Sequence, residues 1–319
     1  MMRSALITGG AGFIGSHVAD RLLADGWGVV AFDNLAVGRE ANVAHLLQRQ
    51  DFSLVRGDIA DRAALAQIVG DFNVNVVIHL AAVHYIPFCA AEPYEAIRIN
   101  VLGTQAVIDA ALAGQVGKIV FASTGDVYAN KDSALTEDDV VDPFTVYGTT
   151  KLVSERLLRL AGASRPQLTV AVARLFNVYG PRETNPHVLP DILTQLRDGG
   201  DTVRLGNLWP KRDFVFVEDV ADALVTLLQS REAFDVFNVG SGCAMTVEEA
   251  VQIIAGALRR PVHATVDPAR VRAVERPCLH GDITKVTRVF GWRPSRTFHG
   301  GMTKWLIDEG VLKAGVATT

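Results

Sequence analysis

The chain has 319 residues, enough for one large α/β domain or two smaller ones with a buried core. Apolar residues make up 49% and charged residues 21%, which excludes long disorder, and a net charge of -4 without Lys/Arg runs argues against nucleic-acid and membrane partners. Cys89, Cys243 and Cys278 form no C-x-x-C pair, no apolar run approaches membrane-spanning length, and no signal peptide is expected. We therefore expect a cytoplasmic protein with buried thiols. The eight histidines show no metal-ligand spacing, so no metal is predicted.

Short apolar runs alternate with helical patterns over the first half of the chain. Continuous apolar runs, typical of strands covered on both faces of a parallel sheet, occur at 5–8, 28–32, 52–55, 74–80, 118–122 and 168–175. Helical patterns lie between them, at 14–24, 62–69, 93–113 and 147–160. This alternation predicts an α/β protein with a doubly wound parallel sheet.

The pattern changes after Gly180, where prolines and glycines divide the chain into short pieces. A helix is predicted at 217–229 and a strand at 234–239. We expect residues 1–178, with about 214–240, to form the first domain. Residues from about 179–213 and 241–319 then form a smaller C-terminal lobe that covers the ligand cleft.

A glycine-rich turn, Thr8-Gly-Gly-Ala-Gly-Phe-Ile-Gly15, follows the first strand and opens the first helix. Gly9 permits the tight turn, Gly12 lets a pyrophosphate approach the backbone, and Gly15 lets helix and strand pack closely. The free N–H groups at the helix N-terminus then face the anion. In this strand–turn–helix context, the pattern predicts a Rossmann dinucleotide site rather than a structural turn.

Asp33 ends the second strand, 18 residues beyond Gly15, where a carboxylate can accept hydrogen bonds from the adenine ribose. A carboxylate there repels a 2′-phosphate, and Asn34, Leu35 and Ala36 carry no positive charge. Arg39 is the nearest cation and can equally be solvated. Asp33 therefore favours NAD over NADP.

Tyr147 and Lys151 lie four residues apart at the start of a predicted helix, so both point from one face. A nearby ammonium, together with an oxidised nicotinamide, favours the phenolate and lowers its pKa. By themselves the two residues also fit an exposed helix surface. Ser123 and Thr124 end the fifth strand at the expected active-site edge, where Thr124 can bind the same substrate hydroxyl.

Several further motifs occur in a fixed order along the chain: Asp33-Asn34-Leu35, Gly57-Asp58-Ile59, His79-Leu80-Ala81-Ala82, Asn100-Val101-x-Gly103-Thr104, Ser123-Thr124-x-x-Val127-Tyr128, Tyr147-x-x-x-Lys151 and Phe176-Asn177-Val178-Tyr179-Gly180-Pro181. Together with the glycine turn, this order resembles the NAD-dependent epimerase/dehydratase family, of the extended short-chain dehydrogenase/reductase type, over nearly the whole chain.

The resemblance implies that Tyr147 and Lys151 are the catalytic pair, assisted by Thr124. It implies cofactor contacts from Phe13, Ile14, Asn34, Asp58, Ile59, Leu80, Ala81, Ala82, Asn100, Ser123, Tyr147 and Lys151. Among these, Asp58 and Ile59 would lie near adenine. Taken alone, Asp58 also fits a plain turn and Asn100 a helix-surface position.

In the second lobe, motifs around 205–214 and 267–294 look more like the GDP-mannose 4,6-dehydratase branch than like UDP-galactose 4-epimerases. By that resemblance the candidate substrate contacts are Tyr85, Asn177, Val188, Leu205, Arg212, Arg272 and Arg276. A guanidinium fork suits phosphate oxygens, although each Arg alone also fits a solvated surface position. Tyr85, beside Ile86 and Phe88, equally fits apolar packing.

The family oxidises the C4 hydroxyl of a nucleotide sugar with NAD, and its branches differ in the next step. Dehydratases carry an acid and a base just after the Thr, where this chain has Gly125-Asp126. Gly125 cannot act as an acid. We therefore expect a C4 epimerase working through a transient 4-keto sugar.

Other functions remain open at this point. They are a 4,6-dehydratase with Asp126 as base, a 4-ketoreductase, and a non-catalytic NAD-responsive regulator. The expected substrate is a UDP-, GDP- or CDP-hexose. The resemblance further implies a homodimer through the helices at 93–113 and 147–160.

Overall fold

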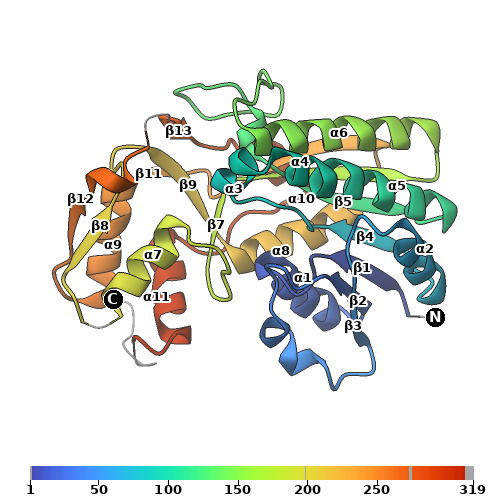
Figure 1. Cartoon of the computed structure of the whole chain (residues 1–319), viewed down its shortest axis with the longest axis horizontal. Coiled ribbons are helices and arrows are strands. Elements are labelled where there is room, and N and C mark those ends of the chain that lie inside the picture. Colours follow the sequence, from blue (N-terminus) through green and yellow to red (C-terminus); the bar gives the residue numbers. More distant parts are fainter. Residues whose placement is uncertain (1, 198, 273–274, 313–319) are drawn as a thin grey trace.

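The computed structural model describes residues 2–197, 199–272 and 275–312. Its centre is a seven-stranded sheet in the order β10-β6-β5-β4-β1-β2-β3, in which every neighbouring pair is parallel (Figure 1). The strands are β1 (Ser4–Thr8), β2 (Gly28–Asp33), β3 (Phe52–Arg56), β4 (Val76–His79), β5 (Lys118–Thr124), β6 (Thr169–Leu175) and β10 (Phe234–Val239). The expected doubly wound parallel sheet is confirmed.

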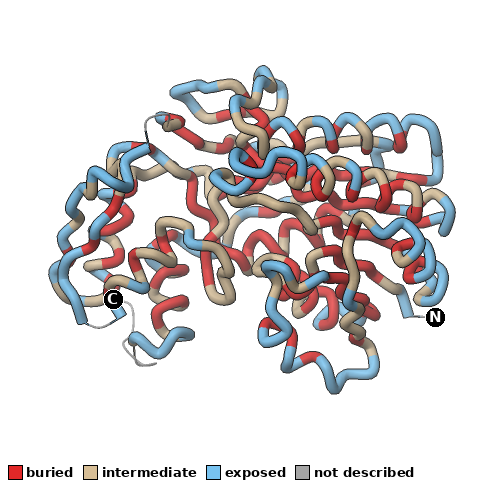
Figure 2. The backbone as a smooth tube through the Cα atoms, viewed as in Figure 1, coloured by how far each residue is buried: buried red, intermediate tan, exposed pale blue. Residues whose placement is uncertain are grey.

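Helices cover both faces of this sheet. One face carries α1 (Phe13–Ala24) and α8 (Val217–Thr226), and the other carries α2 (Arg62–Asp71), α5 (Gly103–Ala113) and α6 (Val146–Ser164). Each layer of helices closes its own apolar core against the strands, which form the buried centre in Figure 2. Strands buried on both faces explain the continuous Val/Ile/Ala runs in the sequence.

The helix predicted at 93–113 is interrupted. It consists of α4 (Pro93–Ile97), the π-helical turn η3 (Arg98–Leu102) and α5. In the described part of the chain this run is the one helical stretch long and apolar enough to cross a bilayer by length and composition, but 56% of its apolar window is buried within the protein. This helical stretch therefore belongs to the layer of helices that covers one face of the large sheet.

The second lobe contains two small sheets. The first pairs β9 (Lys211–Phe216) with β11 (Ala244–Thr246), β13 (Cys278–Leu279) and β7 (Asn177–Tyr179), and the second pairs β8 (Thr202–Leu205) with β12 (His263–Val266). The remaining helices are α3 (Ile86–Ala91), α7 (Val188–Leu196), α9 (Val247–Leu258), α10 (Thr284–Phe290) and α11 (Phe298–Asp308). Short 3-10 turns occupy Glu40–Asn42, Ala44–Leu46, Gly125–Val127, Leu227–Gln229 and Pro268–Arg270.

The lobe has a core of its own, in which the rings of Tyr179, Phe214, Phe298 and Trp305 pack together. The chain enters the lobe after β6, and returns to the large sheet through α8 and β10. We therefore propose the expected division into a Rossmann domain and a substrate lobe, with the return placed after β9.

The three cysteines are free thiols, and Cys89 and Cys278 are buried. Cys243 is exposed, so the expectation of a buried thiol is wrong for this residue. It follows the Ser241-Gly242 turn at the surface, before β11 begins.

Candidate active site and cofactor cleft

The turn between β1 and α1 fits a dinucleotide pyrophosphate. Gly9 has φ of +72°, and a Cβ at this position would lie 2.9 Å from the backbone nitrogen of Ala81. A Cβ on Gly15 would overlap the carbonyl of Gly9. No side chain caps the N-terminus of α1 at Gly12, so the first-turn N–H groups are available to an anion.

Asp33 ties the end of β2 to this turn. Its Oδ2 accepts a hydrogen bond from the N–H of Ala11 at 3.0 Å, and its Oδ1 accepts one from the N–H of Leu35 at 2.8 Å. Burial raises the pKa of Asp33, while these N–H groups oppose the rise. Asn34 and Arg39 are exposed beside it. The carboxylate therefore lies at the turn, as a ribose-binding residue requires.

The segment after β4 forms a wall beside the glycine turn. Leu80, Ala81 and Ala82 are half-buried, and the N–H groups of Leu80 and Ala81 bond to Thr8. Asn100, on the π-helical turn, clamps the continuation of this segment. Its side chain exchanges two hydrogen bonds of 2.8 Å with the backbone of Val83.

Four further residues expected to contact the cofactor lie in the first turn of α1 and in the segment after β3. Phe13 and Ile14 are half-buried in the first turn of α1. Asp58 pairs with Arg98 at 3.2 Å, whereas Ile59 is 4% exposed and packs in the core under Gly103. The Ile59 side chain is therefore a core residue, and only its backbone is available to a ligand.

Tyr147, Lys151 and Thr124 are brought together where α6 crosses the end of β5. The side chain of Thr145 caps α6 by accepting the N–H of Gly148 at 3.0 Å, which sets the start of the helix. The Thr124 hydroxyl lies near enough to the phenol of Tyr147 to lower its pKa. The Lys151 ammonium lies 4.5 Å from the centre of the Phe121 ring.

Burial dominates the electrostatics of this pair. It raises the pKa of Tyr147, with the charge of Asp126 adding to the rise and the nearby Thr124 hydroxyl opposing it. Burial also lowers the pKa of Lys151 to about 7, against the opposing charge of Glu155. The polypeptide alone therefore does not produce the expected lowered phenol pKa, because desolvation and the charge of Asp126 both raise it.

Asp126 follows Thr124 in the 3-10 turn Gly125–Val127, and its N–H donates to the Thr124 hydroxyl at 3.2 Å. Its Oδ1 lies 3.9 Å from Nε of Arg276. Burial raises the pKa of Asp126, while Arg276 and then Arg212 counteract the rise. The Asp126 carboxyl therefore interacts electrostatically both with the Tyr147 phenol and with arginines of the second lobe.

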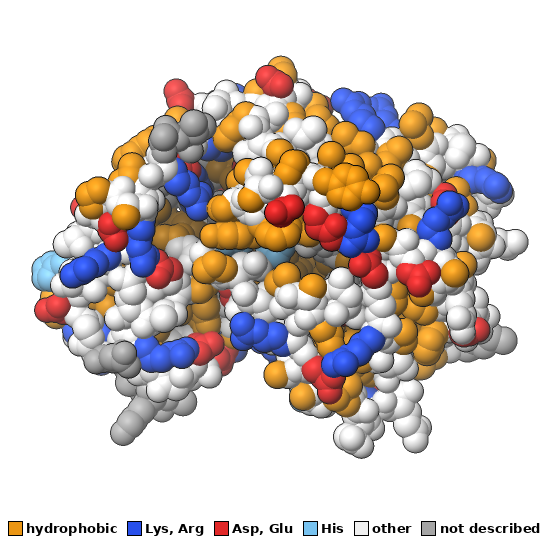
Figure 3. All heavy atoms as spheres, in the orientation of Figure 1, with side chains coloured by type: hydrophobic (Ala, Val, Ile, Leu, Met, Phe, Trp, Pro, Cys, Tyr) orange, Lys and Arg blue, Asp and Glu red, His pale blue; other side chains and the backbone are white. Residues whose placement is uncertain are grey.

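These arginines come from the second lobe. Arg276 is 3% exposed and donates to the carbonyl of Tyr128, while its Nε has no hydrogen-bond partner among the described residues. Arg212 donates to the carboxylate of Glu275 and, at 2.9 Å, to the carbonyl of Arg276. Arg272 is exposed, and its charge acts on Asp126. Figure 3 shows the surface hollowed between the two parts of the chain, with Lys or Arg side chains on the lobe side.

The other expected substrate residues differ in their surroundings. The Oδ1 atom of Asn177 is buried without a partner in the described chain, so it is available to a ligand. Val188 begins α7 and is half-buried, as is Tyr85 just before α3. Leu205 is 3% exposed in the lobe core, and its carbonyl accepts the N–H of Asp267, so its side chain cannot reach a ligand.

The sequence did not single out a polar group that spans the cleft. The side chain of Asn185 contacts Nε2 of His84 at 2.8 Å, the rings of His84 and His187 are 5.9 Å apart, and Nδ1 of His187 lies 2.9 Å from Glu183. Burial lowers the pKa of His84 to about 4, so this ring is neutral. The one signal in the sequence is the run His84-Tyr85-Ile86-Pro87, which places a histidine beside the candidate substrate residue Tyr85. The other residues lie in an irregular loop.

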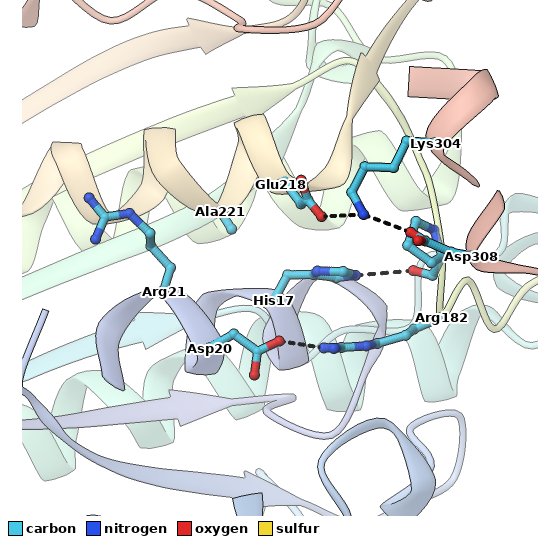
Figure 4. Close-up of a pocket in the computed structure, with 9 residues that line it drawn as sticks. His17, Asp20, Arg21, Arg182, Glu218, Ala221, Lys304 and Asp308 are labelled. Atoms are coloured by element: carbon cyan, nitrogen blue, oxygen red, sulfur yellow. Dashed lines mark hydrogen bonds and ion pairs between the residues drawn. The ribbon is translucent and has the colours of Figure 1, made fainter. Parts of the chain in front are cut away.

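A separate pocket of about 610 Å³ lies between α1, α8 and α11 (Figure 4). Its charged side chains bridge the two domains: Arg182 pairs with Asp20 at 2.8 Å, and Lys304 pairs with Glu218 at 3.4 Å. No expected site residue lines it. Its ion pairs join the lobe to α1 through Asp20 and to α8 through Glu218.

A glycine turn, a carboxylate at the end of the second strand and a Tyr/Lys pair at the carboxyl edge of a parallel sheet define an NAD-dependent enzyme of the short-chain dehydrogenase/reductase type. Residues 5–240 match the model of the NAD dependent epimerase/dehydratase family, and the chain belongs to this family.

Individual relatives agree with this assignment. The chain is 35% identical over 305 residues to a UDP-glucose 4-epimerase of Mycolicibacterium smegmatis, covering 94% of this chain and 96% of the relative. The structure of a Thermus thermophilus UDP-glucose 4-epimerase with NAD has a TM-score of 0.85, at 29% identity and coverage of 98% and 100%. A Streptomyces venezuelae dTDP-glucose 4,6-dehydratase with NAD has a TM-score of 0.86, at 29% identity and coverage of 97% and 99%.

Proposed function

We propose that this chain is a nucleotide-sugar C4 epimerase that acts through a transient 4-keto sugar. The carrying observation is the set of buried Thr124, half-buried Tyr147 and buried Lys151. Thr124 is followed by Gly125-Asp126 and not by an acid and base pair. NAD held in this cleft would supply the hydride acceptor and donor and a positive charge. The residues of this chain then need only to move one proton and hold the sugar in place.

Tyr147 is the proton acceptor for the C4 hydroxyl. Thr124 orients this hydroxyl, and the Lys151 ammonium favours the phenolate over the phenol. Gly9, Gly12 and the following N–H groups would hold the pyrophosphate of the cofactor, and Asp33 would hold its ribose. The backbone after β4 forms the side of this cleft.

The substrate diphosphate fits the polar groups of the second lobe. Arg212, Arg272 and Arg276 supply guanidinium groups, and Asn177 supplies a buried oxygen without a partner among the described residues. A UDP-hexose is the favoured substrate, because UDP-glucose 4-epimerases are among the relatives. The GDP- and CDP-hexoses remain to be tested beside it.

A 4,6-dehydratase is the second candidate, because Asp126 is held beside Tyr147 and a dehydratase is among the related structures. The shorter Asp126 side chain and the lack of an acid at Gly125 make it the weaker one. A ketoreductase and a non-catalytic NAD-responsive protein rank lower. A non-catalytic protein does not need Thr124, Tyr147 and Lys151 together.

We also propose a homodimer formed by α4, α5 and α6. Large apolar side chains are exposed along these helices, including Tyr94 at 80%, Leu102 at 58% and Leu160 at 68%. Figure 3 shows apolar side chains gathered over α4 on the face in view. Exposed apolar side chains gathered on one face are typical of a protein interface. The free thiols suit a cytoplasmic protein.

The test is NMR of the purified protein incubated with NAD and a panel of UDP-, GDP-, CDP- and dTDP-sugars. An epimerase yields a second stereoisomer without net NADH, whereas a 4-keto-6-deoxy sugar would establish the dehydratase instead. Tyr147→Phe should keep the fold and NAD binding and lose about 10²–10⁴-fold in turnover. Unchanged turnover in this variant would refute the catalytic assignment.

A further inference from the structure

A buried carboxylate lies one helical turn beyond Lys151. Tyr147, Lys151 and Glu155 are spaced four residues apart on α6, so they share the helix face that packs against β5. The Glu155 side chain is 3% exposed. The proposed function does not use this group.

Glu155 joins α6 to two neighbouring strands. Its Oε1 accepts the Ser123 hydroxyl at 2.5 Å, and its two oxygens accept Nε and Nη2 of Arg174 at 3.0 and 2.7 Å. Ser123 on β5 and Arg174 on β6 are direct partners in the sheet. The carboxylate thereby fixes the end of β5 immediately before Thr124.

Arg174 is itself buried at 5% exposure and lies 4.6 Å from the centre of the Tyr128 ring, while its Nη1 has no partner in the described chain. Stability alone does not require such a pair, because buried ion pairs can often be replaced by apolar groups at no loss. Its position next to the proposed catalytic residues suggests another use.

Lys151 has few neighbours that can balance its charge. The groups that interact electrostatically with it are Glu155 on the same helix, Cys89 on α3, His79 on β4 and His84 in the following loop. The two histidines are held neutral by burial, and burial keeps the Cys89 thiol protonated. Glu155 is therefore the carboxylate that stabilises the ammonium.

We propose that Glu155 is a positioning residue for the catalytic pair: it holds the end of β5 through Ser123 and supplies the negative charge that keeps buried Lys151 an ammonium ion. The proposal rests on the proposed roles of Tyr147 and Lys151. Removal of this charge would favour neutral Lys151, which cannot stabilise the phenolate.

The experiment is an NMR titration of the lysine side chains in the NAD-loaded enzyme, with Lys151 assigned by its loss in Lys151→Met. In Glu155→Gln the Lys151 titration should move at least about one pH unit lower than in the wild type. Glu232→Gln, which removes an exposed glutamate, should leave it unchanged. An unchanged Lys151 titration in Glu155→Gln would overturn the proposal.

The pH profile of turnover gives a second readout. Glu155→Gln should lose more activity at pH 8 than at pH 6, and Glu155→Asp should restore part of the loss. An equal loss at every pH would indicate a purely structural role and contradict the proposal. If Glu155→Gln does not fold because Arg174 is left unpaired, Glu155→Gln/Arg174→Met removes both charges and should still lower the Lys151 titration.

The two proposals fail in different ways. If Tyr147→Phe retained turnover, the proposed function would be wrong while the Lys151 titration still reported on Glu155. If Tyr147→Phe were inactive and the titration unchanged, only the role of Glu155 would be wrong.

Discussion

The Asn185 side chain donates a hydrogen bond of 2.8 Å to Nε2 of His84, and this bond joins the substrate lobe to the loop that follows β4. His84 is neutral, with its pKa lowered to about 4 by burial, so its ring can accept the bond. A nucleotide sugar bound between the two domains would lie close to this contact. The bond is therefore a structural link between the walls of the proposed substrate cleft.

Asn185→Ala should raise the KM for the sugar nucleotide about 3–10-fold while leaving NAD affinity unchanged, because one hydrogen bond between the cleft walls is lost. Such a bond is typically worth about 1 kcal/mol. Steady-state kinetics and NAD titration measure the two effects. Gln67→Ala, which removes an exposed amide on α2, is the control. Equal effects on KM and NAD affinity would show that Asn185 acts on the whole fold.

Asp126→Asn separates the two candidate reactions. The substitution removes the only carboxylate beside Gly125 without changing the shape of the side chain. An epimerase should keep its turnover within about threefold, whereas a dehydratase that uses this base should lose about 10²-fold or more. Product formation followed by NMR gives the answer, with Asp138→Asn as an exposed control. A large loss of epimerase turnover would place Asp126 in the catalytic machinery.

Asp33→Asn should shift cofactor preference towards NADP by about tenfold or more, corresponding to about 1.4 kcal/mol. The amide keeps the shape of the carboxylate but no longer repels a 2′-phosphate. Dissociation constants for NAD and NADP, compared with those of the exposed Asp25→Asn variant, measure the shift. An unchanged ratio would mean that Asp33 serves only the turn at Ala11 and Leu35.

Buried neutral histidines should make stability depend on pH. Burial lowers the pKa of His84 from 6.5 to about 4, so the unfolded chain binds the proton more readily. Stability from this group is present above pH 6.5 and is lost as pH falls, by about 2 kcal/mol between pH 6.5 and 5. The buried carboxyls of Asp33 and Glu183, whose pKa values are raised, act in the opposite direction.

The effect of His84 is therefore measured as a difference. Denaturant unfolding at pH 5 and pH 7.5 gives the free energy of unfolding at each pH. This free energy should fall more from pH 7.5 to pH 5 in the wild type than in His84→Gln. An equal fall in the free energy of unfolding for the two proteins would mean that protonation of His84 does not destabilise the folded state.

Most of the Rossmann domain could be predicted from the sequence. Strands buried on both faces leave continuous apolar runs, and the run at 234–239 matches β10 residue for residue. The glycine turn was equally readable, because backbone sterics at Gly9 and Gly15 restrict those positions to glycine. The break in the helix at 93–113 was not readable, because the π-helical turn is held by the tertiary contacts of Asn100.

The site was less predictable where long-range packing decides it. The spacing of Tyr147 and Lys151 indicated the pair, but not the desolvation that controls both pKa values. Leu205 was expected to contact substrate and instead packs its side chain in the lobe core. Asn185, His187 and Glu183 lie in an irregular loop, where no periodicity exists to mark them.

The placement of β10 has a consequence for how the protein is made. Until residues 234–239 have left the ribosome, β6 is an unpaired edge of the large sheet. By then the chain has already produced β7, β8 and β9, which belong to the other lobe. Vectorial synthesis therefore delivers part of the second folding unit before the first can close, and the nascent chain must keep β6 from pairing with a neighbour during this interval.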